Sequence, residues 1–397
     1  MHRRDFLAIS ASAALAGLAR SAELPKDVRI TRAVGFDLPS RRSKVAGRNA
    51  RLDVHGDRAN DRMLRLYTNT GLQGIGNCRA EKDAALKLIG KDPFEFYRRD
   101  DRQMVGPLGA GTMPLWDLAG KLLRKPVYEL LGGGGPEKVP VYDGSIYFAD
   151  LLPQYESRWE DRFREEIDMA LKIGHRAVKV KIGRGHKWMK RQEGDDRDVA
   201  VVKLIRKHAG KVLLIGVDGN NGYDLAGTKR FLERAGEADL AFVEELFPEK
   251  VDECLALKEF MKERGWKTLL ADGETQRTLD VFKPFIAARA IDVFQGDMNH
   301  FGFEGILTEA AWAKEKNLLV APHNWGSLIG YYMQLHVGRA ITNFYRAEHD
   351  PLEASALVAE GYDRKVGETT VPSAPGFGLS IDEKALATEG KMRFDVR

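Results

Sequence analysis

The chain has 397 residues, of which 43% are hydrophobic and 30% are charged, and its formal net charge is +4. This composition excludes a disordered chain, and 40 glycines without a regular period exclude a collagen-like fibre. The small positive charge argues against nucleic acid as a partner. Cys78 and Cys254 lie too far apart for a disulfide framework or a zinc motif, although their spacing leaves open whether they pair with each other.

The first 22 residues have the pattern of an export signal. Arg3 and Arg4 precede a short apolar run rich in alanine and leucine, with small residues near Ala19 and Ala22. This pattern is typical of the twin-arginine pathway and predicts a periplasmic or exported protein. The alternative is an ordinary apolar helix. The run is too short for a membrane span, and since no later stretch is long and apolar enough either, we expect no membrane association after removal of the signal.

Residues 23–136 have a mixed pattern that predicts a first domain. Two strand-like runs flank a basic, irregular segment between Arg41 and Arg51, which is interpreted either as a loop over an anionic ligand or as a solvated surface. Helical patterns follow, and a run of four glycines before Pro136 marks the end of this region. The expected strands are Val28–Leu38 and Arg62–Tyr67, and the expected helices are Lys82–Leu88 and Pro114–Leu131.

Residues 137–360 alternate short apolar strands with amphipathic helices. The expected strands are Val139–Ile146, Ala177–Ile182, Val212–Asp218, Leu240–Glu245, Thr268–Glu274, Ile291–Asp297, Leu318–Asn324 and Asn343–His349. The expected helices are Trp159–Ile173, Asp198–His208, Leu225–Ala235, Val251–Glu263, Phe303–Glu315 and Ser327–Ala340. This alternation predicts an α/β fold with parallel strands, and eight strands are the number that closes a (β/α)8 barrel. An open doubly wound sheet is the alternative, but the first strand is not followed by a glycine-rich phosphate loop. Residues 361–397 break the rhythm, and we expect them to pack on the first domain.

Acidic side chains end three successive strands of this region. Asp218, Glu244 and Glu274 are expected at the same end of the sheet, which is the active-site face of a barrel. Three carboxylates held close together repel one another unless a divalent cation binds them, and ligands that are all oxygen favour Mg²⁺, with Mn²⁺ as a possibility. Asn220 follows Asp218 by two residues and is expected on the same side, as a substrate-binding residue.

Lys179 and Lys181 also share one face of their strand, because successive side chains alternate. Two ammonium groups this close disfavour each other's charge. We therefore expect the pKa of one lysine to fall toward neutrality, which makes it a general base. The alternative is two solvated surface lysines.

His323 ends the seventh strand and Asp297 the sixth, so neighbouring strand ends bring a carboxylate to an imidazole. Such a pair fixes the imidazole tautomer and raises its basicity, whereas a lone histidine is more often a structural hydrogen-bonding group. Glu348 ends the eighth strand, where a protonated carboxyl group can donate a hydrogen bond to a substrate oxygen. A lysine base, a His–Asp base and a metal between them suit the removal of a proton α to a carboxylate, through an enediolate.

The motifs together resemble the enolase superfamily, in its mandelate racemase-like branch. They are VKVKIG, VDGNNGYD, FVEEL, ADGE, QGD, APHNWGS and AEHDP, with PLWDLAGKLLRKPVYELLGG before the barrel and PSAPGFGLSID after it. The resemblance implies a modified barrel with an α+β capping domain formed by the N-terminal region and the C-terminal segment. It assigns the base role to Lys181, the metal to Asp218, Glu244 and Glu274, the dyad to Asp297 and His323, and an electrophilic role to Glu348.

The chain also departs from the family. Leu246 stands where the family usually has proline, and the usual pair of glycines does not follow Asp297. Since both changes can reshape the pocket, the substrate cannot be taken over from the best-known members. The resemblance implies dehydration of a sugar acid to a 2-keto-3-deoxy acid, with racemisation or epimerisation of a 2-hydroxy acid as the alternative, and a homo-oligomer. An exported sugar-acid binding protein is the alternative that is not an enzyme.

Overall fold

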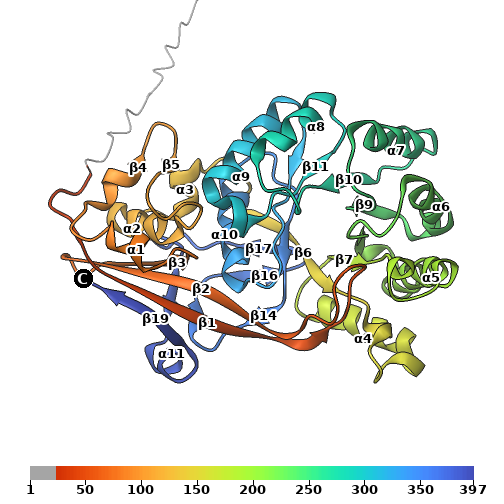
Figure 1. Ribbon diagram of the computed structural model, residues 1–397, viewed down its shortest axis with the longest axis horizontal. Coiled ribbons are helices and arrows are strands. Elements are labelled where there is room, and N and C mark those ends of the chain that lie inside the picture. Colours follow the sequence, from red (N-terminus) through yellow and green to blue (C-terminus); the bar gives the residue numbers. More distant parts are fainter. Residues whose placement is uncertain (1–23) are drawn as a thin grey trace, which may run out of the picture.

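The computed structural model describes residues 24–397, so the predicted export signal lies outside the described residues. It begins with an antiparallel sheet made by β1 (Ile30–Ala46), β2 (Gly56–Thr68) and β3 (Gln73–Asn77). Two strands from the far end of the chain, β14 (Leu352–Glu353) and β19 (Lys391–Val396), pair with β1, and Figure 1 shows the C-terminus beside this sheet. We call residues 30–131 together with β14 and β19 the cap.

Three helices complete the cap. They are α1 (Lys82–Leu86), α2 (Met113–Leu123) and α3 (Val127–Leu131), with a small hairpin of β4 (Tyr97–Arg98) and β5 (Gln103–Met104) between the first two. The sequence predicts one helix over Pro114–Leu131, and this prediction is wrong. Arg124 adopts a left-handed conformation with φ 54°, and Pro126 precedes α3, where its missing N–H is tolerated at a helix start but breaks a helix interior.

The central part of the chain forms a closed ring of parallel strands. The strands are β6 (Lys138–Ile146), β7 (Ala177–Lys181), β8 (Leu214–Asp218), β9 (Leu240–Glu244), β10 (Leu269–Asp272), β11 (Val293–Phe294), β12 (Leu319–Val320) and β13 (Ala347–His349). Each pairs in parallel with the next from β6 to β12, and β13 pairs in parallel with β6. Phe344, just before β13, forms a parallel bridge with Val320 of β12, so the ring closes. The predicted α/β barrel is confirmed.

Helices surround this ring (Figure 1). They are α4 (Trp159–Lys172), α5 (Arg191–Ala209), α6 (Leu225–Ala235), α7 (Val251–Glu263), α8 (Phe282–Ala288), α9 (Met298–Glu315) and α10 (Leu328–Ala340). The helix α8 is not among the predicted helices, and α5 begins earlier than predicted. The predicted start at Phe303 is correct for the long part of α9, because Gly302 interrupts that helix with φ 62° where the backbone of Ala110 approaches too closely for a side chain.

The segment after the barrel contacts both parts of the molecule. A hairpin of β16 (Asp363–Lys365) and β17 (Glu368–Thr370) pairs with the start of β6. A second pair, β15 (Leu357–Ala359) with β18 (Leu379–Ile381), precedes α11 (Glu383–Glu389) and the cap strand β19. The expectation that residues 361–397 pack on the first domain therefore holds for β19 but not for the hairpin. The exact domain limits stay predictions.

The barrel interior places the polar groups at one end. Its apolar layer is Tyr142, Ala177, Phe242, Ala271, Val293 and Ala321. Alternation along each strand puts the next inward side chain two residues later, which on β7 is Lys179.

Cys78 and Cys254 are both buried and free. Among the described residues, every helix is too short or too polar to cross a membrane.

Candidate active site

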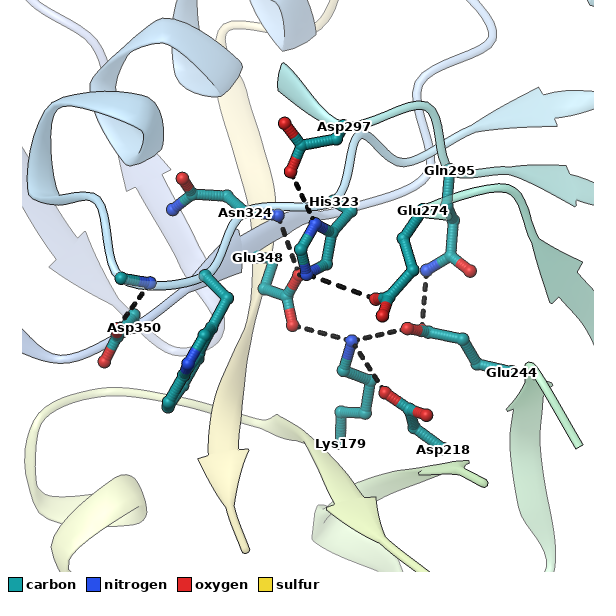
Figure 2. A network of polar contacts seen from close by, with 12 residues as sticks. Lys179, Asp218, Glu244, Glu274, Gln295, Asp297, His323, Asn324, Glu348 and Asp350 are labelled. Atoms are coloured by element: carbon teal, nitrogen blue, oxygen red, sulfur yellow. Dashed lines mark hydrogen bonds and ion pairs between the residues drawn. The ribbon is translucent and has the colours of Figure 1, made fainter. Parts of the chain in front are cut away.

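Three carboxylates meet at the C-terminal end of the barrel strands, as the sequence predicts. Asp218 ends β8, Glu244 ends β9 and Glu274 follows β10. One carboxylate oxygen of each lies within 4.8 Å of the other two, and Figure 2 shows them facing a common centre. Burial raises the pKa of Glu244, Lys179 lowers it and the other two carboxylates raise it, and the net result is a pKa of about 8. Like charges in one buried place need a cation to balance them.

The two lysines of β7 point into this carboxylate group. The Nζ of Lys179 lies 2.6 Å from Glu244 Oε1, 2.7 Å from Glu348 Oε1 and 3.3 Å from Asp218 Oδ2 (Figure 2). The Nζ of Lys181 donates to Asp218 Oδ2. Both lysines are almost fully buried, which excludes the alternative of solvated surface lysines.

The expected fall of one lysine pKa is wrong for the described side chains. Burial lowers the pKa of Lys179, but Glu244 and Glu348 raise it by more, to well above its ordinary value. Burial likewise lowers the pKa of Lys181, but Asp218, Tyr147 and Glu274 together raise it by more. Repulsion between the two ammonium groups does not dominate, because each lysine is itself the counter-ion of a buried carboxylate.

His323 and Asp297 form the predicted pair. His323 Nδ1 lies 2.7 Å from Asp297 Oδ2, and since a carboxylate only accepts, the imidazole carries a proton on Nδ1. The other ring nitrogen, Nε2, faces the site, 3.1 Å from Glu274 Oε2 and 4.0 Å from Glu348 Oε2. Burial lowers the pKa of His323, whereas Glu274 and the hydrogen bond with Asp297 raise it, to about 10. In the ring of strands β12 lies almost opposite β7, so His323 and the lysines approach from different sides.

Glu348 and Asn220 also reach the site. Glu348 on β13 accepts from the backbone N–H of Asn324 at 2.9 Å through Oε2, while Oε1 contacts Lys179. Asn220 has a left-handed backbone with φ 41°, and its Nδ2 donates weakly to Glu274 Oε1 at 3.3 Å. Its side-chain oxygen is buried and has no hydrogen-bond partner among the described residues. The structure therefore brings all nine predicted site residues together at one end of the barrel.

One buried residue of the site is missed by the sequence analysis. Gln295 follows β11, and its Nε2 donates to Glu244 Oε2 at 2.7 Å. It lies two residues before Asp297 and so on the same side of the chain, which is the signal that identifies it in hindsight. Since Lys179 holds the other oxygen of Glu244, this carboxylate is oriented from both sides (Figure 2).

The basic segment after Arg41 is not a free loop that offers positive charges to a ligand. Arg42 and Lys44 belong to β1, and each is buried in an ion pair with a barrel carboxylate, Arg42 with Asp350 at 2.5 Å and Lys44 with Glu166 at 2.7 Å. Arg51 donates to the backbone of the turn after β8 at 2.8 Å. These cations therefore attach the cap to the barrel.

The chain is similar to several known proteins. Residues 162–385 match the model of the family described as enolase C-terminal domain-like. A galacturonate dehydratase variant from a Geobacillus species, solved with Mg, has a TM-score of 0.86 and 29% identity over 94% of this chain and 99% of that chain. A mandelate racemase/muconate lactonizing protein from a Geobacillus species, complexed with magnesium and tartrate, has a TM-score of 0.84 and 30% identity over 92% and 96%.

A curated relative is also similar to this chain over most of its length. The D-galactarolactone cycloisomerase of Agrobacterium fabrum is 26% identical over 85% of this chain and 92% of its own length. The family model covers more than half of the chain, and the similar structures cover nearly all of it. The chain therefore belongs to the enolase C-terminal domain-like family, among the mandelate racemase-like members of the enolase superfamily.

Proposed function

We propose that the protein is an Mg²⁺-dependent enzyme that removes the proton α to the carboxylate of a sugar acid and then eliminates the β-hydroxyl group as water. The observation that carries this proposal is one carboxylate triad with Lys181 on one side and the His323–Asp297 pair on the other. The similar galacturonate dehydratase was also solved with D-galacturonate and 5-keto-4-deoxy-D-galacturonate, a sugar acid and a keto-deoxy product. A curated relative of 28% identity is an arabinonate dehydratase.

The residues present fit a divalent cation of the Mg²⁺ type. Asp218, Glu244 and Glu274 would hold it, since all three offer hard oxygen ligands. When bound, the ion balances their charge and stabilises negative charge that develops on the substrate carboxylate. Mn²⁺ prefers the same kind of ligands and is the expected substitute.

The side chains divide the proton transfers between them. Asp218 and Glu274 hold Lys181 and His323 in their charged forms, and with these carboxylates bound to the cation Lys181 or His323 would lose its proton and could take the α proton. The electron pair of the broken C–H bond then moves into the carboxylate to give an enediolate. The pair then forms a C–C double bond while the β C–O bond breaks, and His323 Nε2 protonates the leaving hydroxyl group to give water. The enol product becomes a ketone by taking a proton at the former β carbon and releasing the proton of its enol hydroxyl group to the solvent. Asp297 keeps Nε2 directed at the substrate throughout.

Two bases on different sides also favour a second candidate function. If one base removes the α proton and the other returns a proton to the opposite face, a 2-hydroxy acid is racemised or epimerised. A binding protein that is not an enzyme requires neither a buried triad nor two opposed bases, so that alternative leaves the arrangement of Lys181 and His323 unexplained.

The test is incubation with Mg²⁺ and a panel of sugar acids in D₂O, followed by NMR. Dehydration predicts a keto-deoxy acid that carries deuterium at the former β carbon, whereas racemisation predicts the epimer with deuterium at the α carbon. Lys181→Ala and His323→Asn each remove one base and should abolish different signals. A panel that shows neither exchange nor product with wild-type protein contradicts the proposed function.

We also propose export by the twin-arginine pathway, which rests on Arg3 and Arg4 before the apolar run. Replacement of both by lysine should leave the protein in the cytoplasm of its host, as measured by fractionation. Unchanged export contradicts this proposal. Assembly into a homo-oligomer stays a prediction, and light scattering of the purified protein tests it.

A further inference from the structure

The cap holds the N-terminus of the barrel helix that follows His323. Asp61 on β2 is 2% exposed, and its Oδ2 accepts from the backbone N–H groups of Leu328 at 2.9 Å and Ile329 at 3.2 Å, which are the first residues of α10. Its Oδ1 accepts from the hydroxyl group of Ser327. A carboxylate at the N-terminus of a helix satisfies N–H groups that have no partner within the helix. Here the carboxylate comes from a strand of the cap.

A second cap residue holds the turn that leads into this helix. Arg42 on β1 forms two hydrogen bonds with Asp350, at 2.6 and 2.5 Å, and both side chains are buried. Asp350, which Figure 2 labels, in turn accepts from the backbone N–H of Gly326 at 3.0 Å. The guanidinium group of Arg42 lies 4.3 Å from the ring of Trp325, whose Nε1 donates to His55 of the cap at 3.1 Å.

The turn of residues 323–328 carries one side of the proposed chemistry. His323 lies at its start, and the N–H of Asn324 donates to Glu348. The barrel holds the backbone of His323 through hydrogen bonds with Gly296 and Met298. From Trp325 onward the described partners of the turn come mainly from the cap or from Asp350, which Arg42 holds.

The side of the site that carries the two lysines is held by the barrel and not by the cap. Lys179 and Lys181 lie within β7, whose backbone pairs with β6 and β8 in the middle of the ring. Their ammonium groups contact carboxylates of barrel strands, namely those of Asp218, Glu244 and Glu348. The position of these lysines therefore follows from the barrel itself.

We propose that the cap positions one side of the reaction only: Arg42 and Asp61 are positioning residues that hold the turn 323–328, and with it His323, against the carboxylate triad, while the lysine side depends on the barrel alone. This inference rests on the proposed function, because it assigns Lys181 and His323 to separate proton transfers. The cap is then part of the acid–base machinery and not only a cover over the substrate.

The experiment compares Arg42→Lys and Asp61→Asn with the two base variants in the D₂O assay. Lys181→Ala and His323→Asn first define which NMR signals depend on which base. Both cap variants should then reproduce the His323→Asn pattern, with at least a tenfold loss of the signals that depend on His323 and less than a twofold loss of the others. A uniform loss of all signals, the Lys181→Ala pattern, or unchanged His323-dependent signals overturns the proposal.

Lys44→Met is the matched control. Lys44 lies on the same strand as Arg42, is also buried, and joins the cap to the barrel through Glu166 on α4, far in sequence from the turn 323–328. This variant removes a buried ion pair between cap and barrel without touching the turn, so both sets of signals should stay unchanged. If it copies Arg42→Lys, the effect comes from general loosening of the cap, and the proposal is wrong.

A second measurement does not need a substrate and so separates this inference from the proposed function. Amide hydrogen exchange of Leu328 and Ile329 should become at least tenfold faster in Asp61→Asn, with the amides of β7 unchanged. Trp325→Phe removes the hydrogen bond with His55 and reduces the ring contacts with Arg42 and Tyr147. It is the mild variant should Asp61→Asn or Arg42→Lys not fold, and it should loosen the same amides. Equal acceleration in β7, or none in the turn, overturns the inference even if dehydration is confirmed.

Discussion

At the scale of single residues, the site works by balancing buried charges. Lys179 contacts three carboxylates and so neutralises part of a negative cluster that burial alone makes unfavourable. Asp218 illustrates the effect: burial raises its pKa, but Lys181 and Lys179 lower it by more, to below the usual range. Asp218 therefore stays ionised, as does Glu274, whose pKa is also lowered, whereas the raised pKa of Glu244 shows that this carboxylate gains most from a bound cation.

Gln295 provides a prediction at this scale. Its amide orients Glu244, and loss of such a partner behind a metal ligand typically weakens metal binding about 10–100-fold. Gln295→Met keeps the volume and removes the donor, so the Kd for Mg²⁺ measured by calorimetry should rise by that factor. Gln334→Met is the control, because Gln334 is equally buried but bonds only the backbone of Glu348. An unchanged Kd in Gln295→Met contradicts the assigned role.

At the scale of elements, individual side chains attach the cap to the barrel helices. Glu304 on α9 accepts from Trp116 Nε1 at 2.9 Å, from Thr112 Oγ1 at 2.9 Å and from the N–H of Met104 at 3.1 Å, all three in the cap. One carboxylate thus satisfies donors from α2, from its N-cap and from β5. These donors have no water to replace the carboxylate, because the surrounding side chains are buried.

Replacing Glu304 should destabilise the protein without reaching the site. In Glu304→Leu the three donors lose their acceptor, and an unsatisfied buried donor costs about 1–3 kcal/mol. The free energy of unfolding in urea should fall by at least that amount. Glu315→Gln at the exposed end of the same helix is the control and should change it by less than about 0.5 kcal/mol. Equal stability of both variants would show that the contact contributes nothing.

At the scale of the whole molecule, buried neutral histidines join distant parts of the chain. His336 on α10 accepts from the N–H of Tyr128 at 3.1 Å and donates to the hydroxyl group of Tyr362 at 2.8 Å, linking α3, α10 and the C-terminal segment. Burial lowers the pKa of His336 to about 3 and that of His175 to about 4. Both imidazoles are therefore neutral in the folded protein.

This burial predicts acid sensitivity. Below about pH 6.5 the unfolded chain takes up a proton at each of these histidines and the folded chain does not, so stability is complete above that pH and falls as the pH is lowered. For each histidine, the free energy of unfolding falls by about 1.4 kcal/mol per pH unit, until the pH reaches the pKa of that histidine in the folded protein. Urea unfolding at pH 7.5 and pH 5 should show it, with a smaller slope in His336→Phe. A stability that rises on acidification contradicts this account.

The sequence predicts much of the barrel and the site because both follow from residue patterns within single strands and from the repeat of strand and helix. Alternation within one strand places Lys179 and Lys181 together, and the repeat of strand and helix places Asp218, Glu244 and Glu274 at one end. The contacts of Arg42 and Asp61 with the turn after His323 are not predictable in this way, because they join residues far apart in the chain. The lysine pKa values were predicted wrongly for a related reason, since they depend on carboxylates from other strands.

The proposed chemistry depends on one divalent ion between the lysine side and the histidine side of the barrel. The most direct measurement is anomalous diffraction from crystals of the protein soaked with Mn²⁺. We expect one strong peak per chain within coordination distance of Asp218, Glu244 and Glu274, and its loss in Glu244→Gln. A peak bound by other residues, or no peak at the triad while the metal binds elsewhere, would contradict it.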